Sequence, residues 1–292
     1  MKHRIAAVLT VFLALALSAT AAASAGDAAP TGSSTSATPT VDTKDPVALM
    51  TASQKAFLYV EKDMKVRIDM QLIDKSGKQR EKVMTMLRCN VANSDDQKYF
   101  IYFQKPGDIR GMTFMVWKHP GKEDERWLYI SSIDMVKRIA ANDSRSSFVG
   151  SDFTYEDVSG RDIAADTHKL LKEEKLGDRD CYVVESTPKS AVEYARKLTW
   201  IDAQNFLPLK EEYYNAQNEL FRVFTADKVE ELPVGASDPA RKVPTITHRT
   251  MKNLKTGHST EITFSEVSYD NGLKEEDFNE RHLRTPPHEW TN

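Results

Sequence analysis

The sequence predicts a mainly β protein with a few helices, in which antiparallel strands follow one another along the chain. Apolar and polar residues alternate with a period of two over many short segments, and turns rich in Gly, Pro, Asn and Asp separate these segments. Only one long segment, which precedes the strands, has helical periodicity. The strands are expected to form one or two consecutive antiparallel arrays, with about twelve strands in total. Because several strands are amphipathic, we expect the sheet to curl over apolar contents.

The first 25 residues have the features of a cleavable export signal. Lys2 and Arg4 precede an apolar run at residues 5–17, and Ala23-Ser24-Ala25 has the small-residue pattern that signal peptidases cleave. A membrane anchor is the alternative, but the run is shorter than the roughly 20 apolar residues that a spanning helix needs. No cysteine that could carry a lipid follows the run. We therefore expect a signal peptide at residues 1–25 and a product that is free in the periplasm.

The remaining chain is expected to consist of a linker and one domain. Residues 26–44 are rich in Ala, Ser, Thr and Pro, cannot bury enough apolar surface to fold, and are expected to be a flexible linker. Residues 45–292 contain no second linker and are expected to form a single, monomeric domain. Without Lys2 and Arg4 the formal net charge changes from −3 to −5, which argues against a nucleic-acid partner.

The ordered region is expected to begin with a helix and a meander of strands. Asp45 and Pro46 form an N-cap and a first helical position, and residues 47–60 then present a wide apolar face. Strands are expected at residues 64–72, 83–91, 99–104, 111–118 and 126–131. A helical turn is expected at residues 134–139.

A long, polar loop at residues 142–162 interrupts the strands. Loops of this length are usually functional or disordered, and Phe148, Phe153 and Tyr155 indicate that this one is anchored. We expect it to act as a lid or as a partner-docking edge, with these candidate residues: Ser147, Phe148, Gly150, Ser151, Asp152, Phe153 and Tyr155.

The second half of the chain returns to strands and ends in a short helix. Strands are expected at residues 167–175, 181–186, 196–201, 207–214, 219–229, 245–253 and 259–268, and a charged helix at residues 275–283. Cys89 and Cys181 lie in separate predicted strands. A disulfide between them and two buried thiols both stay open, because two distant cysteines bond only if the fold brings them together.

The sequence has no pattern that is typical of a catalytic or metal site, so we expect neither an enzyme nor a cofactor or metal. Ser151 lacks the G-x-S-x-G frame of a nucleophile elbow, and the histidines lack metal-ligand spacing. Paired carboxylates can act as acid and base, but they also cap turns and pair with arginines, and we prefer this structural interpretation. It concerns a cluster near Arg145 and Arg161 that contains Asp152, Glu156, Asp157 and Asp162.

Methionine and aromatic residues are concentrated in the first strands. The simpler interpretation is a core between sheet and helix, and the sharper one is a concave, apolar interior that holds acyl chains, since methionine adapts to flexible partners. The candidate cavity walls are Met64, Ile68, Met70, Phe100, Tyr102, Phe114, Val116, Leu128 and Ile130. The sequence pattern does not decide which strand face points inward.

Several segments together resemble a known family. They are KPGDIRGMTFM at residues 105–115, WLYI at 127–130, SSFVGSDFTYED at 146–157, CYVVESTP at 181–188 and LPLKEEYY at 207–214. Their order resembles that of the outer-membrane lipoprotein-sorting (LolA-like) proteins, in the periplasmic branch associated with RND-type lipid exporters. The resemblance covers the chain from about residue 45 to its end, and the loop sequence SFVGSDFTY at 147–155 is its most specific part.

This resemblance implies an unclosed antiparallel β-barrel of about 11–12 strands, with helices that plug its concave side. It also implies a hydrophobic cavity for the acyl chains of lipids or lipoproteins. We therefore expect a periplasmic carrier that moves such cargo toward the outer membrane with an RND-type membrane transporter. The alternatives are a lipid-sensing or lipoprotein-sensing module that binds a membrane protein, and a hydrolase that uses the acidic loop.

Overall fold

The computed structural model describes residues 41–235 and 238–291. The predicted signal peptide and residues 26–40 of the predicted linker lie outside the described residues. Residues from Val41 onward belong to one compact unit. Among the described residues, no helix has the length and apolar character needed to span a membrane.

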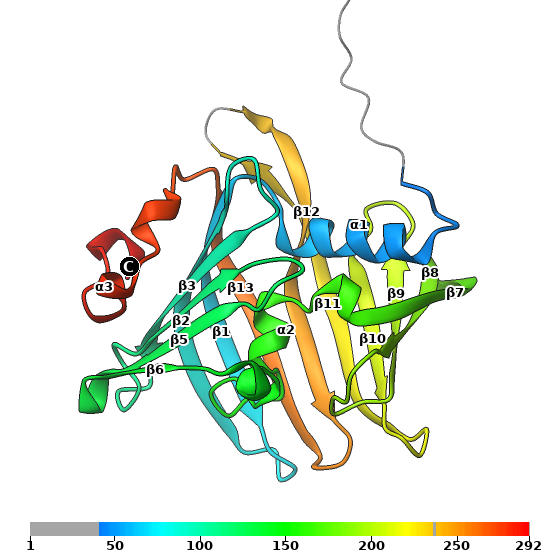
Figure 1. Ribbon diagram of the computed structural model, residues 1–292, viewed down its shortest axis with the longest axis horizontal. Coiled ribbons are helices and arrows are strands. Elements are labelled where there is room, and N and C mark those ends of the chain that lie inside the picture. Colours follow the sequence, from blue (N-terminus) through cyan, green and yellow to red (C-terminus); the bar gives the residue numbers. More distant parts are fainter. Residues whose placement is uncertain (1–40, 236–237, 292) are drawn as a thin grey trace, which may run out of the picture. The chain divides into compact units, whose positions relative to one another are not determined.

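One antiparallel sheet of thirteen strands forms the scaffold, in the order β6-β5-β4-β3-β2-β1-β13-β12-β11-β10-β9-β8-β7. Two meanders therefore run outward from the central pair β1 and β13, and the sheet is not closed (Figure 1). The strands are β1 Asp63–Ile73, β2 Gln79–Asn90, β3 Gln97–Lys105, β4 Thr113–Lys118, β5 Glu125–Ile130, β6 Met135–Arg138, β7 Asp166–Leu176, β8 Arg179–Pro188, β9 Arg196–Asp202, β10 Pro208–Tyr214, β11 Leu220–Val234, β12 Asp238–Asn253 and β13 His258–Tyr269. The predicted mainly β, unclosed fold is confirmed.

The helical turn expected at residues 134–139 is wrong. Asp134 has a positive φ of 46° and turns the chain back, so that Met135–Arg138 pairs with β5 as the edge strand β6. In that position the backbone of β6 bonds to the open edge of β5, which a helical turn would leave without a partner. This edge strand raises the count from the expected twelve or so to thirteen.

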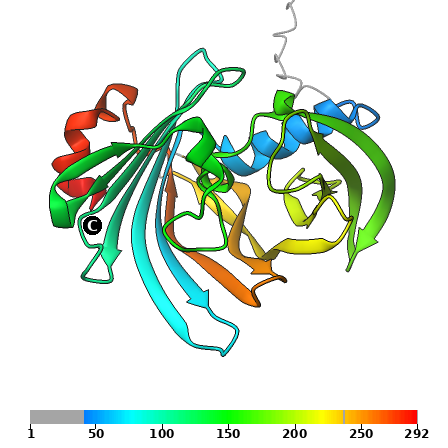
Figure 2. The same cartoon turned by 60° about the horizontal axis from the view of Figure 1, so that its bottom comes forward.

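Helices cover both faces of the sheet (Figure 2). Helix α1 (Pro46–Leu58) and helix α2 (Tyr155–Ser159) lie on the concave side, as predicted, whereas helix α3 (Glu280–Arg284) lies on the convex side. The charged helix expected at 275–283 is divided between a 3-10 turn at Glu275–Asp277 and α3. Further 3-10 turns occur at Ser131–Ile133, Ala141–Arg145, Ile163–Ala165 and His288–Trp290.

The N-terminus of α1 follows the predicted capping pattern. The carboxylate of Asp45 accepts a hydrogen bond from the backbone N–H of Val47 at 2.9 Å, and Pro46 occupies the first turn, where no N–H is required. Leu49 and Met50 then pack against Val184 of β8 and Ile201 of β9. The helix is thereby held across the second half of the sheet.

We expect the Asp45→Ala variant to lose about 1 kcal/mol of unfolding free energy, because the first turn of α1 loses its side-chain acceptor. Urea unfolding followed by circular dichroism would measure the change. Asp45→Asn is the control, since an asparagine retains the acceptor and should stay within a few tenths of a kcal/mol of the wild type. Equal losses in both variants would contradict the capping role.

The C-terminal segment covers the convex face of β2–β5. Trp290 lies against Phe100 and Phe278 with ring centroids 5.0 Å apart in each pair, and the indole N–H of Trp117 donates to the carbonyl of Phe278 at 2.8 Å. Leu87, Met115 and Trp127 belong to the same buried cluster. The convex face of this half of the sheet is therefore already occupied by the chain itself.

Both cysteines are free, buried thiols. Cys89 lies in the convex cluster under the C-terminal segment, whereas Cys181 lies in a separate cluster with Val183 and Trp200. Burial raises the pKa of each thiol to about 11. Of the two possibilities that the sequence left open, the structure therefore has the two thiols and no disulfide.

Candidate functional site

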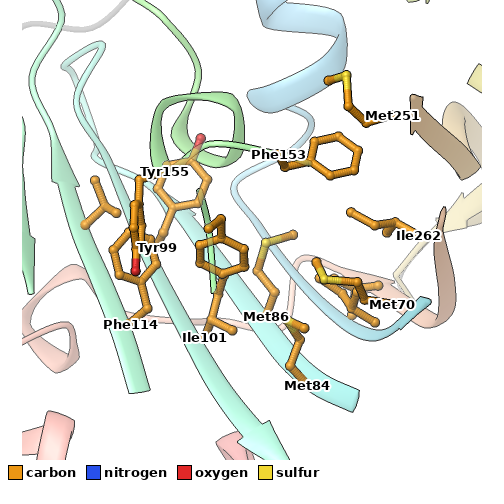
Figure 3. Close-up of a cluster of buried hydrophobic side chains, with 14 of the residues drawn as sticks. Met70, Met84, Met86, Tyr99, Ile101, Phe114, Phe153, Tyr155, Met251 and Ile262 are labelled. Atoms are coloured by element: carbon orange, nitrogen blue, oxygen red, sulfur yellow. The ribbon is translucent and has the colours of Figure 1, made fainter. Parts of the chain in front are cut away.

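The concave face of β1–β4 is a continuous apolar surface. Side chains that alternate along these strands point toward one another and toward the segment that carries α2 (Figure 3). They include Met70, Met84, Met86, Tyr99, Ile101 and Phe114, all of which are almost fully buried. Across the centre of the sheet, Ile262 of β13 and Met251 of β12 continue this surface. The apolar face thus extends over six neighbouring strands.

Residues 146–159, which we call the lid segment, fill the middle of this face. Phe148, Phe153 and Tyr155 are 1%, 5% and 6% exposed. The ring of Phe148 lies 5.6 Å from that of Phe114 and 5.3 Å from that of Tyr155, and Tyr155 lies 5.1 Å from Phe114. The predicted aromatic anchoring of the long loop is confirmed. Its rings occupy the space where the concave face is most apolar.

Local hydrogen bonds give the lid segment its shape. The backbone N–H of Phe148 donates to the carbonyl of Phe153 at 2.7 Å, around a turn in which Gly150 has a φ of +80°. A side chain at Gly150 would be strained in this left-handed conformation. Thr154 and Asp157 then form a reciprocal capping box that starts α2. The segment therefore has its own structure before it contacts the sheet.

Polar contacts attach the lid segment to both halves of the sheet. In the first half, Lys82 donates to the carbonyl of Val149, and Lys118 donates to the carbonyl of Gly160, just after the segment, at 2.7 Å. On β13, the hydroxyl of Thr260 accepts from the backbone N–H of Asp152 at 2.9 Å and donates to its carboxylate at 2.8 Å. Burial raises the pKa of this carboxyl. Such contacts hold the segment without a covalent link.

A cavity of about 130 Å³ lies beside the lid segment, beneath α1 and against the second half of the sheet. Its apolar wall comes from α1, the lid segment and the sheet, and includes Met50, Phe57, Phe153, Phe224, Met251 and Ile262. Two smaller spaces, of about 30 and 20 Å³, continue toward β1 and β2. Outside α1, an open groove of about 460 Å³ shares Gln54, Asp162, Ile163, Asp166 and His168 with the cavity wall. The groove therefore adjoins the cavity.

Charged residues form the other wall of this cavity. Arg222 of β11, which is 4% exposed, pairs with Asp157 of the lid segment at 3.1 Å and with Glu193 at 3.0 Å. Beside it, Glu211 accepts from Lys197 and from the hydroxyl of Tyr213, each at 2.6 Å. Burial by itself would raise the pKa of Glu211, but these partners and Arg222 lower it. Glu211 is therefore held in its ionised form by its partners, whereas burial raises the pKa of Glu193.

Arg249 of β12 differs from these paired residues because it lies among aromatic rings. It borders the main cavity and both smaller spaces, and its guanidinium lies over the rings of Phe264, Phe57 and Phe153 at 4.5, 5.4 and 6.0 Å. It has no ion pair among the described residues, and its Nε has no hydrogen-bond partner there. Burial and the neighbouring Arg88 lower the pKa of Arg249 to about 9.

The predicted cavity residues fall on both faces of the sheet. Phe100 and Tyr102 lie on the convex face, against the C-terminal segment, and so lie away from the cavity. The others belong to the concave apolar cluster or pack against it: Met64, Ile68, Met70, Phe114, Val116, Leu128 and Ile130. Of these, Ile68, Met70 and Met64 border the smaller spaces, whereas Phe114 is covered by the lid segment. Ligand contact by any of them stays a prediction.

The sequence reasoning missed the charged wall. Arg222 alternates with Phe224, and Arg249 alternates with Met251, so each arginine occupies an inward position of its strand. A charged residue at a strand position where the alternation predicts an apolar one was the signal that could have found both arginines.

Each member of the acidic cluster has a structural partner. Asp157 pairs with Arg222, Glu156 pairs with Arg161 at 3.1 Å, and Asp162 caps the 3-10 turn Ile163–Ala165. The described residues contain no group of His, Cys, Asp and Glu side chains that could hold a metal ion. The preferred structural interpretation of this cluster agrees with these contacts.

The sheet is unclosed, and α1 and the lid segment lie over its apolar concave face beside a partly charged cavity. These features define a half-barrel with an internal cavity. A family model described only as "Uncharacterized protein" matches residues 95–285, which is more than half of the chain. Comparison with curated proteins finds no match.

Solved structures share this half-barrel. A putative outer membrane lipoprotein-sorting protein domain from Vibrio parahaemolyticus is 26% identical, with a TM-score of 0.73 over 82% of this chain and 98% of that one. A DUF1329 family protein from Desulfovibrio piger is 24% identical, with a TM-score of 0.71 over 82% and 99% of the two chains. The LolA superfamily protein NE2245 from Nitrosomonas europaea is 17% identical, with a TM-score of 0.60 over 81% and 98%.

The chain belongs to the family that the matching model describes, and its fold is that of the LolA-like outer-membrane lipoprotein-sorting proteins. The resemblance predicted from the sequence is confirmed.

Proposed function

We propose that this protein is a periplasmic carrier that binds the acyl chains of lipids or lipoproteins on the concave face of its half-barrel. It acts as a monomer without a cofactor, and it passes its cargo toward the outer membrane in cooperation with an RND-type membrane transporter. The observation that carries this proposal is the apolar concave face, which the lid segment covers through side-chain contacts and hydrogen bonds alone.

Burial of an acyl chain on this face would supply the binding free energy. Each buried CH₂ group contributes about 0.8 kcal/mol, so a long chain is held without any specific polar contact. Methionines line the path: Met84 and Met86 lie on β2 opposite Ile68 and Val66 of β1, and Met70 of β1 belongs to the same apolar cluster. Their unbranched side chains adapt to a flexible ligand. A carrier must also release its cargo. A surface that binds through apolar burial does not require a precise ligand geometry, so no specific polar contact has to break on release.

The lid segment has to move for the cargo to enter. The main cavity, at about 130 Å³, is smaller than the roughly 300 Å³ or more that ligand sites usually offer. The rings of Phe148, Phe153 and Tyr155 take up the remaining space on the concave face. We therefore infer that an acyl chain replaces these rings, and that the lid segment swings outward or docks on a partner.

The comparisons support the same class of cargo. The structure from Vibrio parahaemolyticus, which is the most identical of the three, is described as a lipoprotein-sorting domain, and it matches nearly its whole length to this chain. The proposal extends that description to lipids in general, because an apolar face selects acyl chains whatever they are attached to.

The proposal is tested by gentle purification from the periplasm, followed by native mass spectrometry and lipid extraction of the same sample. We expect phospholipid or acylated peptide near one molecule per chain, and uptake of offered lipid by stripped protein. A ligand-free mass together with no uptake would refute the carrier. That result would favour the alternative, a sensing module that binds a membrane protein.

A further inference from the structure

The unpaired guanidinium of Arg249 lies where the apolar and charged parts of the concave side meet. Its neighbours on the two adjoining strands are apolar, with Ile262 beside it on β13 and Ala226 beside it on β11. Arg88 of β2 borders the same two small spaces. Asp157 also borders one of these spaces, but its carboxylate is engaged by Arg222 and by the backbone N–H of Thr154. Among the described residues, no carboxylate is therefore left to neutralise Arg249.

Aromatic rings alone do not satisfy this side chain. A guanidinium has five N–H donors, and ring faces attract its charge without offering the in-plane acceptors that these donors need. The Nε atoms of both Arg249 and Arg88 are buried without a partner among the described residues. The Nη1 of Arg88 donates to the carbonyls of Phe57 and Leu58, at 3.3 and 2.9 Å, and these bonds hold the end of α1. Arg249 has no equivalent contact within the part of the chain that the structure describes.

The space around Arg249 is connected to apolar surface on one side. Ile68, Met70, Met84 and Met86 border one of the small spaces that Arg249 also borders. The main cavity lies on its other side. A ligand with an anionic end and an apolar tail would match this arrangement, with its oxygens at Arg249 and its tail along the methionines of β1 and β2.

We propose that Arg249 binds the anionic head group of a single-chain acyl ligand, either a carboxylate or a phosphate. This inference rests on the proposed function and names its ligand class: an acid with a long alkyl tail, rather than a neutral lipid. Arg249 supplies a planar, bidentate donor pair for either anion, and Arg88 adds a second positive charge. In the ligand-free protein, the three phenylalanine rings keep the guanidinium in position.

The experiment compares three ligands of equal chain length: hexadecanoate, hexadecyl phosphate and hexadecanol. Their affinities are measured by native mass spectrometry and titration calorimetry for the wild type, Arg249→Met and Arg249→Lys. We expect the wild type to bind at least one of the two acids about 10–100-fold more tightly than the alcohol, as for a charge-assisted hydrogen bond. The acid whose affinity exceeds that of hexadecanol by the larger factor identifies the head group.

Arg249→Met should remove the preference for the acids over hexadecanol, whereas Arg249→Lys should retain part of it. Lys175→Met is the control, because Lys175 is an exposed residue of the β7–β8 hairpin and should alter no affinity. If the wild type binds the alcohol as tightly as both acids, the inference fails and the proposed carrier stands. If it binds none of the three ligands, both fail.

Stability gives a second readout that does not depend on any ligand. Replacing an unpaired, partly buried cation with an apolar side chain of similar length should raise the Tm of the ligand-free protein, by about 2–8 °C. A lower Tm for Arg249→Met would mean that the contacts between Arg249 and the phenylalanine rings stabilise the fold, and it would overturn the inference.

Discussion

Replacing Phe148 with alanine is expected to lower the unfolding free energy by about 3–5 kcal/mol, and a bound acyl chain is expected to restore much of this loss. Phe148 is 1% exposed and packs between Phe114, Phe103 and Tyr155, so its removal leaves a void in the concave apolar cluster. If acyl chains occupy that space in the loaded carrier, the void admits part of an acyl chain with less movement of the lid segment. Hexadecanoate at one hundred times its Kd would add about 2.7 kcal/mol.

Phe100→Ala is the matched control for this experiment. Phe100 has the same side chain, is 0% exposed and lies on the same half of the sheet, but it faces Trp290 on the convex side. Its loss should cost about the same 3–5 kcal/mol, yet an acyl ligand should stabilise this variant only as much as it stabilises the wild type. Thermal unfolding with and without ligand measures both. Equal rescue of the two variants would contradict an acyl site beneath the lid segment.

Replacing Arg222 with methionine is the second change with a large expected effect. Arg222 is the only basic partner that the structure gives to Asp157 and Glu193 among the described residues, and all three side chains lie in the cavity wall. Its removal leaves two carboxylates near each other without a counter-charge. Asp157 and Glu193 keep 18% and 35% of their side chains exposed, so solvent screening reduces the roughly 3–5 kcal/mol that is typical of a fully buried pair. Chemical unfolding should show a loss of about 2–3 kcal/mol.

The exposed pair of Lys175 and Asp180 offers a contrast. Their nitrogen and oxygen lie 2.9 Å apart, but both side chains are more than half exposed. Solvent screening leaves such a pair little net value, so Lys175→Met should stay within about 0.5 kcal/mol of the wild type. Similar losses in Arg222→Met and Lys175→Met would show that the cavity network does not stabilise the fold.

The Arg222 variant should also loosen the lid segment. Asp157 caps α2 through the backbone N–H of Thr154 and at the same time pairs with β11, so it links the lid segment to the second half of the sheet. Aromatic rings hold the other side of the segment to the first half. In Arg222→Met we expect faster amide hydrogen exchange at residues 153–159 than in the wild type.

Much of the scaffold followed from the sequence alone, because it depends on local chemistry. Alternating polarity marked nearly every strand, and short turns made neighbouring strands antiparallel. Asp45 and Pro46 located the start of α1. The aromatic residues of the lid segment indicated its anchoring.

Tertiary structure decided which strand face is concave and what lies on it. Both faces of β3 and β4 are apolar, since the C-terminal segment covers the face opposite the cavity, so alternation could not separate Phe100 and Tyr102 from Phe114. The edge strand β6 formed because β5 offered an open edge, which no local pattern records. Arg222, Glu211 and Arg249 come from three strands that meet only in the folded sheet. Local periodicity thus determined the strands, whereas the site arises from pairing between residues far apart in the chain, whose charges and rings meet only after folding.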